Sequence, residues 1–305
     1  MRGGGGVTHM SSKKPLLSLA CILALSTTIN AQRPSDALIR FGTTHPDNFF
    51  QGWRTNKHRN NFFLYEAYND NTGRHVTSGA QDRKNYTLNL STINGNSATN
   101  SYVRVVVKGD KTISENLNNK TIQVHYSFRE GNSGWTNHTL NNTTIKYAKI
   151  DNQAQSEYKA TGSTSTIEEL HNDATRVVLK KGNGGTINVT TLNQNSNGST
   201  EIYDGVNVTN ANVNNGKFYQ QGGTIATLTI KNGEFKQGYQ ANNDTIANDG
   251  GTITNLTIDN GTFTKAKGSV TGTITNTNGN IANMANSSIN TITSTNGNIT
   301  NAGTI

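Results

Sequence analysis

The stretch that decides the fold is residues 222–235, GGTIATLTIKNGEF, which returns 28 residues later as residues 250–263, GGTITNLTIDNGTF. A second pair of copies, TITNTNGNI at 273–281 and TITSTNGNI at 291–299, is offset by 18 residues. Apolar and polar residues alternate within each copy, as expected of a β-strand with one buried face. Asn-Gly pairs separate the alternating runs and are typical of tight turns.

Short strands, regular turns and a period near 20 residues predict a stacked, all-β parallel solenoid over residues 182–305. One face of each coil would bury Ile, Leu, Val and Phe, and Asn side chains would stack in ladders at the corners. The alternative is a low-complexity disordered tract. The retained alternation and the absence of Pro from this tract favour the solenoid. Because the chain stops within a repeat, at residues 303–305, we expect a truncated reading frame.

The composition of this repeat tract resembles the repeat passengers of bacterial autotransporters, particularly the large vacuolating-cytotoxin-like proteins. The resemblance covers the residues from 182 onward, where Gly, Asn, Thr and Ile dominate. It implies an extended β-helix on the outside of a cell, available for contact with a host surface.

The N-terminus has the pattern of a secretory signal peptide over residues 1–31. Lys13 and Lys14 precede an apolar run, Leu16–Leu25, and small residues lead to Ala31. This run has about half the length that a membrane-spanning helix needs. The alternative is a buried helix of the mature fold, and Met10 is an alternative start. We therefore predict a protein that is secreted or displayed on a bacterial cell surface.

The composition excludes several functional classes. The lone cysteine, Cys21, lies in the predicted signal peptide, so the mature chain has no disulfide and no cysteine metal site. The histidines lack metal-ligand spacing, and no later segment is apolar enough to span a membrane. The net charge is +6 over residues 32–181 and −1 beyond them. That basic balance suits an anionic partner or a plain solvated surface, but no basic cluster is interleaved with aromatics as in a nucleic-acid binder.

Residues 32–181 contain both tryptophans and most of the other aromatic residues, which indicates a compact α+β head. Helices are expected near Pro46–Trp53 and at Thr166–His171, the latter because Glu168 and Glu169 follow a Thr that can cap the helix. Strands are expected at Ala37–Phe41, Tyr102–Val107, Thr121–Phe128 and Ala174–Leu179.

The order of short motifs in this head resembles the catalytic subunit of pertussis toxin and its ADP-ribosyltransferase relatives. The motifs run in the family's order over nearly the whole head, although each is short. They are residues 38–53 with a strand arginine and a Pro-acidic pair, 69–74 with a Thr-Gly-Arg turn, 90–93 in place of a Ser-Thr-Ser strand, 121–129 as a hydrophobic strand, Gln155-Ser156-Glu157-Tyr158, and 167–178.

The resemblance implies a secreted toxin that transfers ADP-ribose from NAD to a host protein. Glu157 would stabilise the positive charge that develops on the ribose as the nicotinamide bond breaks. Ser91 would position Glu157 as the second catalytic residue, and Arg40 would bind the dinucleotide through its phosphates or ribose. Trp53 or Tyr158 would stack on a ring of NAD. No metal site is implied.

The chain also departs from the family pattern. Ile93 replaces the last Ser of the Ser-Thr-Ser strand, Asp70 lies where the family has a histidine, and the family's disulfide is impossible. The general base that activates the acceptor is therefore unassigned. The alternative function is a surface adhesin or autotransporter passenger fragment without catalysis.

Overall fold

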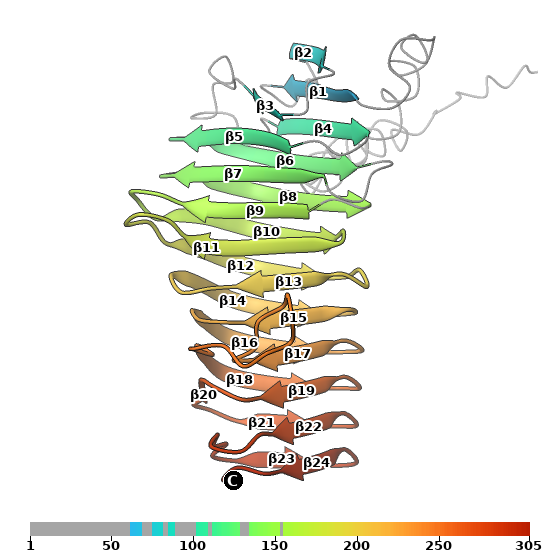
Figure 1. Cartoon of the computed structure of the whole chain (residues 1–305), viewed down its shortest axis with the longest axis vertical. Coiled ribbons are helices and arrows are strands. Elements are labelled where there is room, and N and C mark those ends of the chain that lie inside the picture. The colour runs from blue at the N-terminus through green and yellow to red at the C-terminus, as the bar shows by residue number, and fades with distance from the viewer. Residues whose placement is uncertain are drawn as a thin grey trace, which may run out of the picture.

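The computed structural model describes the backbone of residues 62–68, 75–81, 85–88 and 102–108, and residues 112–128, 134–152 and 155–305. Every regular element of these residues is a β-strand. From Thr112 onward they form one parallel β-solenoid, in which successive coils stack along the long axis (Figure 1).

Each coil contributes a strand to each of two sheets. Sheet 1 has 13 strands, and sheet 2 has 11. In spatial order, sheet 1 contains β2 (His75–Gln81), β1 (Phe62–Tyr68), β4 (Tyr102–Lys108), β6 (Thr121–Phe128), β8 (Thr144–Asn152), β10 (Ser165–Asp173), β12 (Ile187–Gln194), β14 (Val206–Val213), β16 (Thr224–Ile230), β18 (Thr252–Ile258), β21 (Ile274–Asn276) and β23 (Ile292–Ser294), with β20 (Ser269–Val270) beside β18. Sheet 2 contains β3 (Asn85–Leu88), β5 (Thr112–Asn118), β7 (Trp135–Asn141), β9 (Gln155–Ala160), β11 (Arg176–Lys181), β13 (Ser199–Ile202), β15 (Lys217–Gln220), β17 (Glu234–Gln237), β19 (Thr262–Lys265), β22 (Asn280–Asn283) and β24 (Asn298–Asn301).

Strands from neighbouring coils pair in parallel, except at the N-terminal end of sheet 1. There β1 pairs antiparallel with both β2 and β4. From β4 onward every pairing of the named strands is parallel. The antiparallel β1–β2 pair is therefore the first layer of sheet 1 among the described residues.

The sequence repeats fix the register of the C-terminal coils, as predicted. Ile225 pairs with Ile253 and Phe235 with Phe263, at the 28-residue offset. Ile274 pairs with Ile292, at the 18-residue offset. Because like residues stack on like, each coil places its apolar side chains directly over those of the previous coil, and the predicted solenoid is confirmed.

The core lies between the two sheets and is continuous along the stack. In sheet 2 it includes a column of three fully buried rings, Phe218, Phe235 and Phe263. The ring centroids of Phe218 and Phe235 are 5.0 Å apart, and those of Phe235 and Phe263 are 6.0 Å apart. Offset or tilted rings at these distances add a favourable aromatic contact to the burial of apolar surface.

The middle strands of sheet 1, β10, β12, β14, β16 and β18, share a two-residue interruption of their alternation. In β16 the buried residues are Ile225, Leu228 and Ile230, so two outward residues follow the first buried one. β10 has the same feature, since Glu168 and Glu169 both face outward. The helix predicted at Thr166–His171 is therefore wrong. Thr166, Glu168 and Glu169, which suggested the capped start of a helix, instead lie within this kinked strand.

The solenoid continues without a break across the expected boundary at residue 181. β10 pairs with β12, and β11 pairs with β13, on either side of it. Residues 112–181, expected within the α+β head, thus form stacked coils. The rest of that head, apart from the backbone of β1 to β4, lies outside the described residues, together with the strand and helix expected at 37–41 and 46–53. Strands predicted at 102–107, 121–128 and 174–179 correspond to β4, β6 and β11.

One corner of the coils is built from Asn-Gly pairs, as the turn pattern predicted. A Cβ atom on Gly261 would lie 2.4 Å from the carbonyl oxygen of Gly233, and one on Gly279 would lie 2.6 Å from that of Gly261. Because such contacts are far inside van der Waals distance, only glycine fits at this corner. The Asn before each glycine is exposed, and its side chain lies at the edge of the stack.

The 28-residue coil is longer than its neighbours because a loop, residues 238–250, is inserted between β17 and β18. The loop folds back over the outer face of sheet 2, where Tyr239 and Ala241 pack with Tyr219 of β15 (Figure 1). Tyr239 and Ile246 form an antiparallel bridge within it. The insertion is thus ordered by the sheet beneath it.

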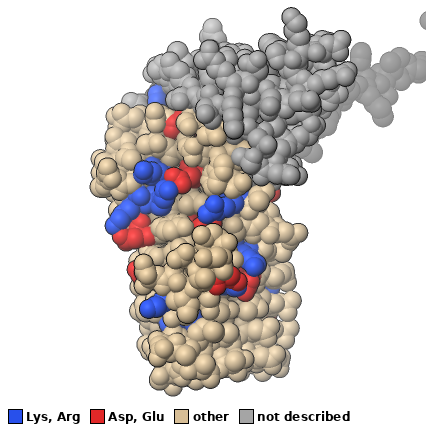
Figure 2. All heavy atoms as spheres, viewed as in Figure 1, with Lys and Arg blue, Asp and Glu red and all other residues tan. Residues whose placement is uncertain are grey.

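Charged side chains are concentrated on one part of the solenoid. Figure 2 shows Lys, Arg, Asp and Glu over the upper and middle coils, whereas the coils at the C-terminal end carry none on that face. The sequence explains this asymmetry, since no charged residue follows Lys267.

Candidate functional site

Six polar or aromatic side chains meet inside the first described coils, between the two sheets. Alternation in the sheet 2 strands aims every second residue inward, so residues that are register partners stack on one another. The cluster consists of Glu115 on β5, Tyr126 on β6, Thr136 and His138 on β7, and Ser156 and Tyr158 on β9. We call this group the buried polar cluster.

His138 is the centre of this cluster. Its Nδ1 contacts the carboxylate of Glu115 from the preceding coil. Its Nε2 lies 3.0 Å from the Ser156 hydroxyl of the following coil and 3.1 Å from the Thr136 hydroxyl, and these two hydroxyls are 2.7 Å apart. The imidazole therefore links three successive coils through hydrogen bonds.

Two tyrosines enclose this arrangement. The Tyr158 ring stacks on His138, with centroids 4.2 Å apart and planes 9° apart, and Tyr126 meets His138 edge-on at 4.7 Å. The Tyr126 hydroxyl donates to Glu115. Burial, followed by the negative charge of Glu115, raises the pKa of Tyr126 well above its usual value, and the same two causes raise the pKa of Tyr158. Both phenols therefore stay protonated at neutral pH.

The order Ser156–His138–Glu115 matches the contacts of a serine hydrolase triad, but the cluster is sealed. All six side chains have at most 1% of their surface exposed. A nucleophile must be reached by its substrate, and the Ser156 side chain has no exposed surface. Buried polar groups of this kind instead satisfy one another and fix a unique register. The Tyr158 hydroxyl is the one member without a hydrogen-bond partner among the described residues.

The two described residues of the predicted NAD site lie on opposite faces of β9. Glu157 points outward, where its carboxylate is 2.7 Å from the ammonium of Lys180 on β11. Tyr158 points inward and stacks on His138 with no exposed surface. The structure therefore does not bring these two side chains together. Arg40, Trp53 and Ser91, the other predicted site residues, lie outside the described residues.

The outer face of sheet 2 carries an ionic cluster, centred on Arg176 and Glu201, that the sequence did not predict. Arg176 forms two hydrogen bonds to the carboxylate of Glu201, and the Tyr203 hydroxyl donates to the same carboxylate at 3.0 Å. The Arg176 guanidinium also lies over the Trp135 ring, 5.5 Å from its centroid. The hydrogen bonds to Glu201 are the main cause that raises the pKa of Arg176. The cluster fixes β7, β11 and β13 relative to one another.

The inserted loop adds a second ordered feature to this face. Lys236 of β17 pairs with Asp244 of the loop and lies 3.2 Å from Glu234. Its ammonium is 5.5 Å from the Tyr239 ring centroid. The loop tip is open to solvent, and Ile246 is 53% exposed. A loop that is held to the sheet at its base and exposed at its tip is suited to contact with a partner.

Searches for a metal site and a membrane span in the described residues, and for similar proteins, give no further candidate site. Within the part of the chain that the structure describes, no group of three His, Cys, Asp or Glu side chains is placed to hold a metal ion. No helix found among the described residues has the length and apolar character to cross a bilayer. Comparison with family models, curated proteins and solved structures finds no match to this chain. None of these comparisons supports the resemblance of residues 32–181 to ADP-ribosyltransferases.

A sequence signal for the buried polar cluster exists. His138, Tyr158 and Leu179 are register partners at intervals of 20 and 21 residues. The same coil period could have been sought upstream of residue 182. One such repeat is present there, since residues 117–122, LNNKTI, return as residues 140–145, LNNTTI, and stack on them.

Proposed function

We propose that this chain is a secreted or surface-displayed β-solenoid that acts as a binding scaffold without catalysis, of the adhesin or passenger type. The observation that carries the proposal is that the polar groups of the core are inaccessible, whereas the outer face of sheet 2 is accessible. The histidine and serine that contact each other as in a hydrolase, His138 and Ser156, are sealed in the core. The outer face of sheet 2, by contrast, presents an anchored loop with an exposed tip.

The loop at residues 238–250 is the proposed contact with the partner. Insertions in solenoids map to loops on one face, which is often the binding face. This insertion interrupts an otherwise short repeat, and it is held by Lys236, Tyr239 and Tyr219 rather than lying free. Because its anchor is formed in the absence of a partner, binding would need little further ordering of the chain.

The preceding coil offers a matched control, since β15 reaches β16 through the short turn Gln221-Gly222-Gly223. The test variant replaces residues 238–249 with one Gln, which reproduces that turn before Gly250. The full chain and this variant are labelled, and binding to cultured epithelial cells is measured by flow cytometry.

We expect saturable binding by the full chain and its loss in the loop-shortened variant, with the circular dichroism spectrum of a β-solenoid unchanged. Equal binding by a folded loop-shortened variant would remove the loop from the proposal. Absence of saturable binding by the full chain would contradict the scaffold function on this surface.

ADP-ribosyl transfer, with NAD as substrate and a host protein as acceptor, stays a prediction with its own test. The full chain is incubated with NAD, and released nicotinamide is measured. Release that is abolished in Glu157→Gln and strongly reduced in Arg40→Ala would support a transferase. Lys180→Gln is the matched control, because it removes the partner of Glu157 and leaves the carboxylate in place.

A further inference from the structure

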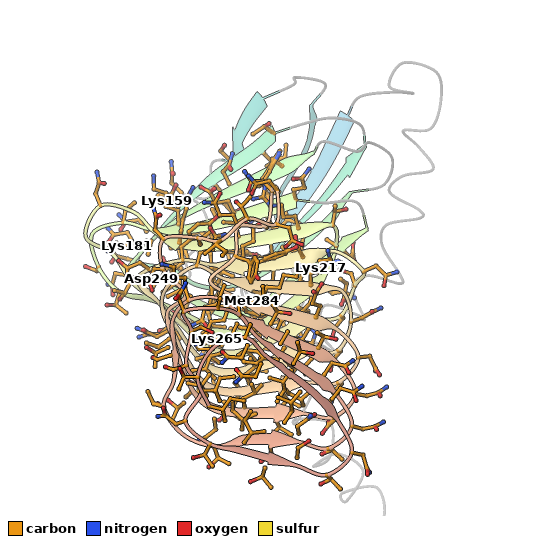
Figure 3. All side chains as sticks on the ribbon, turned by 60° about the horizontal axis from the view of Figure 1, so that its bottom comes forward. Lys159, Lys181, Lys217, Asp249, Lys265 and Met284 are labelled. Carbon is orange, nitrogen blue, oxygen red and sulfur yellow. The ribbon has the colours of Figure 1, made fainter. Side chains whose placement is uncertain are left out.

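We infer that Asn232 is a site of spontaneous deamidation, selected by its place in the Asn-Gly corner of the solenoid. Six exposed asparagines precede glycine at this corner, on the edge of the stack that Lys217 marks in Figure 3. They are Asn197, Asn215, Asn232, Asn260, Asn278 and Asn296. Asparagine before glycine is chemically labile because no side chain hinders attack by the glycine nitrogen.

The hydrogen bonds along this corner are directional. Nδ2 of Asn260 donates to Oδ1 of Asn232 at 3.3 Å, and Nδ2 of Asn278 donates to Oδ1 of Asn260 at 3.3 Å. Each side chain thus donates toward the preceding coil and accepts from the following one. Asn232 begins this run: within the described chain its Nδ2 donates no hydrogen bond.

This position activates Asn232. Its carbonyl oxygen accepts the bond from Asn260, which polarises the carbonyl and stabilises the negative charge that oxygen gains during attack. Its amino group has no bond to break before it leaves as ammonia. The Gly233 N–H also makes no hydrogen bond to the described residues, so the attacking nitrogen is not occupied.

The other asparagines of the run lack this combination. The amino group of Asn260 is bound to Asn232. That of Asn278 is bound to Asn260, and the nitrogen of Gly279 is occupied as well, since it donates to Asn276 at 2.9 Å. Deamidation at either residue must first break a bond that Asn232 does not make.

A similar contrast holds at the other three Asn-Gly pairs of this corner. Asn197 accepts a bond from Asn215 at 2.7 Å, but the Gly198 nitrogen donates to Ser196 at 3.1 Å. Asn215 has its amino group bound to Asn197. Asn296 has neither a donor on its carbonyl nor a bound amino group among the described residues, so it lacks the polarisation that Asn232 receives.

The reaction balances without any cofactor. The Gly233 nitrogen forms a bond to Cγ of Asn232, the Cγ–Nδ2 bond breaks, and ammonia leaves with the proton of the glycine amide. Water then opens the resulting succinimide at either carbonyl, giving aspartate or isoaspartate. The product places a carboxylate on the solvent-exposed edge of the stack.

The test is peptide mapping by mass spectrometry of the full chain during incubation in mildly alkaline buffer. We expect Asn232 to convert about 2- to 10-fold faster than Asn260 and Asn278, the factor that one hydrogen bond supplies. Incubation in concentrated urea is the control, because all three sites then have the same Asn-Gly chemistry and should convert at similar rates.

The variant Asn260→Ala removes the donor to Asn232 and the acceptor of Asn278. It should slow conversion at Asn232 and accelerate it at Asn278. Equal rates at Asn232, Asn260 and Asn278 in the folded chain would overturn the inference. The same ranking in urea would also overturn it, since the selectivity would then come from local sequence and not from the corner.

Discussion

Replacing His138 by Phe tests whether the buried carboxylate of Glu115 depends on His138 for its stability. The Phe ring can keep the stacking on Tyr158, but it removes the groups that contact Glu115, Thr136 and Ser156. Glu115 is 1% exposed and cannot turn its carboxylate to water. Breaking a buried pair in this way costs about 3–5 kcal/mol. We expect the lower end of that range, because Tyr126 still donates to Glu115.

The double variant Glu115→Gln with His138→Phe separates charge from packing. Gln keeps an acceptor for the Tyr126 hydroxyl and removes the buried charge. We therefore expect it to recover about 2 kcal/mol of the free energy of unfolding that His138→Phe loses, since no unpaired carboxylate remains.

Amide hydrogen exchange is the suitable assay, because each coil of a solenoid contacts mainly its neighbours and stability is local. Amides of β5, β7 and β9 should lose protection in His138→Phe, whereas those of β17 and β19 serve as the internal control. A double variant as unprotected as His138→Phe alone would refute the reasoning, since the loss could not then arise from an uncompensated charge.

Three further variants probe other parts of the stack. Phe235→Ala should lower the free energy of unfolding by about 3–5 kcal/mol in urea titration, because it leaves a cavity between two stacked rings, and Phe235→Leu should lose much less. Burial lowers the pKa of Lys265, so its ammonium destabilises the fold at neutral pH. Lys265→Gln, which matches Gln237 in the adjacent strand, should raise the free energy of unfolding at neutral pH, and this gain should vanish above pH 10.5, where the unfolded lysine is also neutral. Burial raises the pKa of Tyr219 from 10.0 to about 12. Its contribution to stability is therefore complete below pH 10 and lost as pH rises toward 12, and Tyr219→Phe should shift alkaline unfolding, followed by circular dichroism, to higher pH.

The sequence was sufficient for the fold where successive coils repeat the same residues. Ile225 over Ile253 and Phe235 over Phe263 are visible as a repeat in the amino-acid sequence itself, and the register follows from them. Farther upstream fewer residues repeat. Residues 117–122, LNNKTI, return as residues 140–145, LNNTTI, but most stacked positions share only their burial, as Val177 and Ser156 do. A repeat of burial without a repeat of residue type is hard to detect in one sequence, and the coils of residues 112–181 were missed because so few of their residues repeat.

The candidate site could be predicted less well, because its residues meet only through stacking. Glu115, His138 and Ser156 come from three different coils, and no local motif joins them. The helix expected at Thr166–His171 failed for a related reason. Two outward residues, Glu168 and Glu169, separate Ile167 from Leu170, and that spacing is shared by helices and by kinked strands.

Because no charged residue follows Lys267, the upper coils and the last described coils of the solenoid respond to different solution conditions. Ions in solution screen the pairs that join the upper coils, such as those of Glu157 and Arg176, within about 10 Å at 0.1 M salt. The last coils have no such pairs to screen, and they are held by backbone hydrogen bonds, side-chain amide contacts and apolar contacts. Raising the ionic strength should therefore lower the stability of the upper coils and leave that of the coils after Lys267 unchanged.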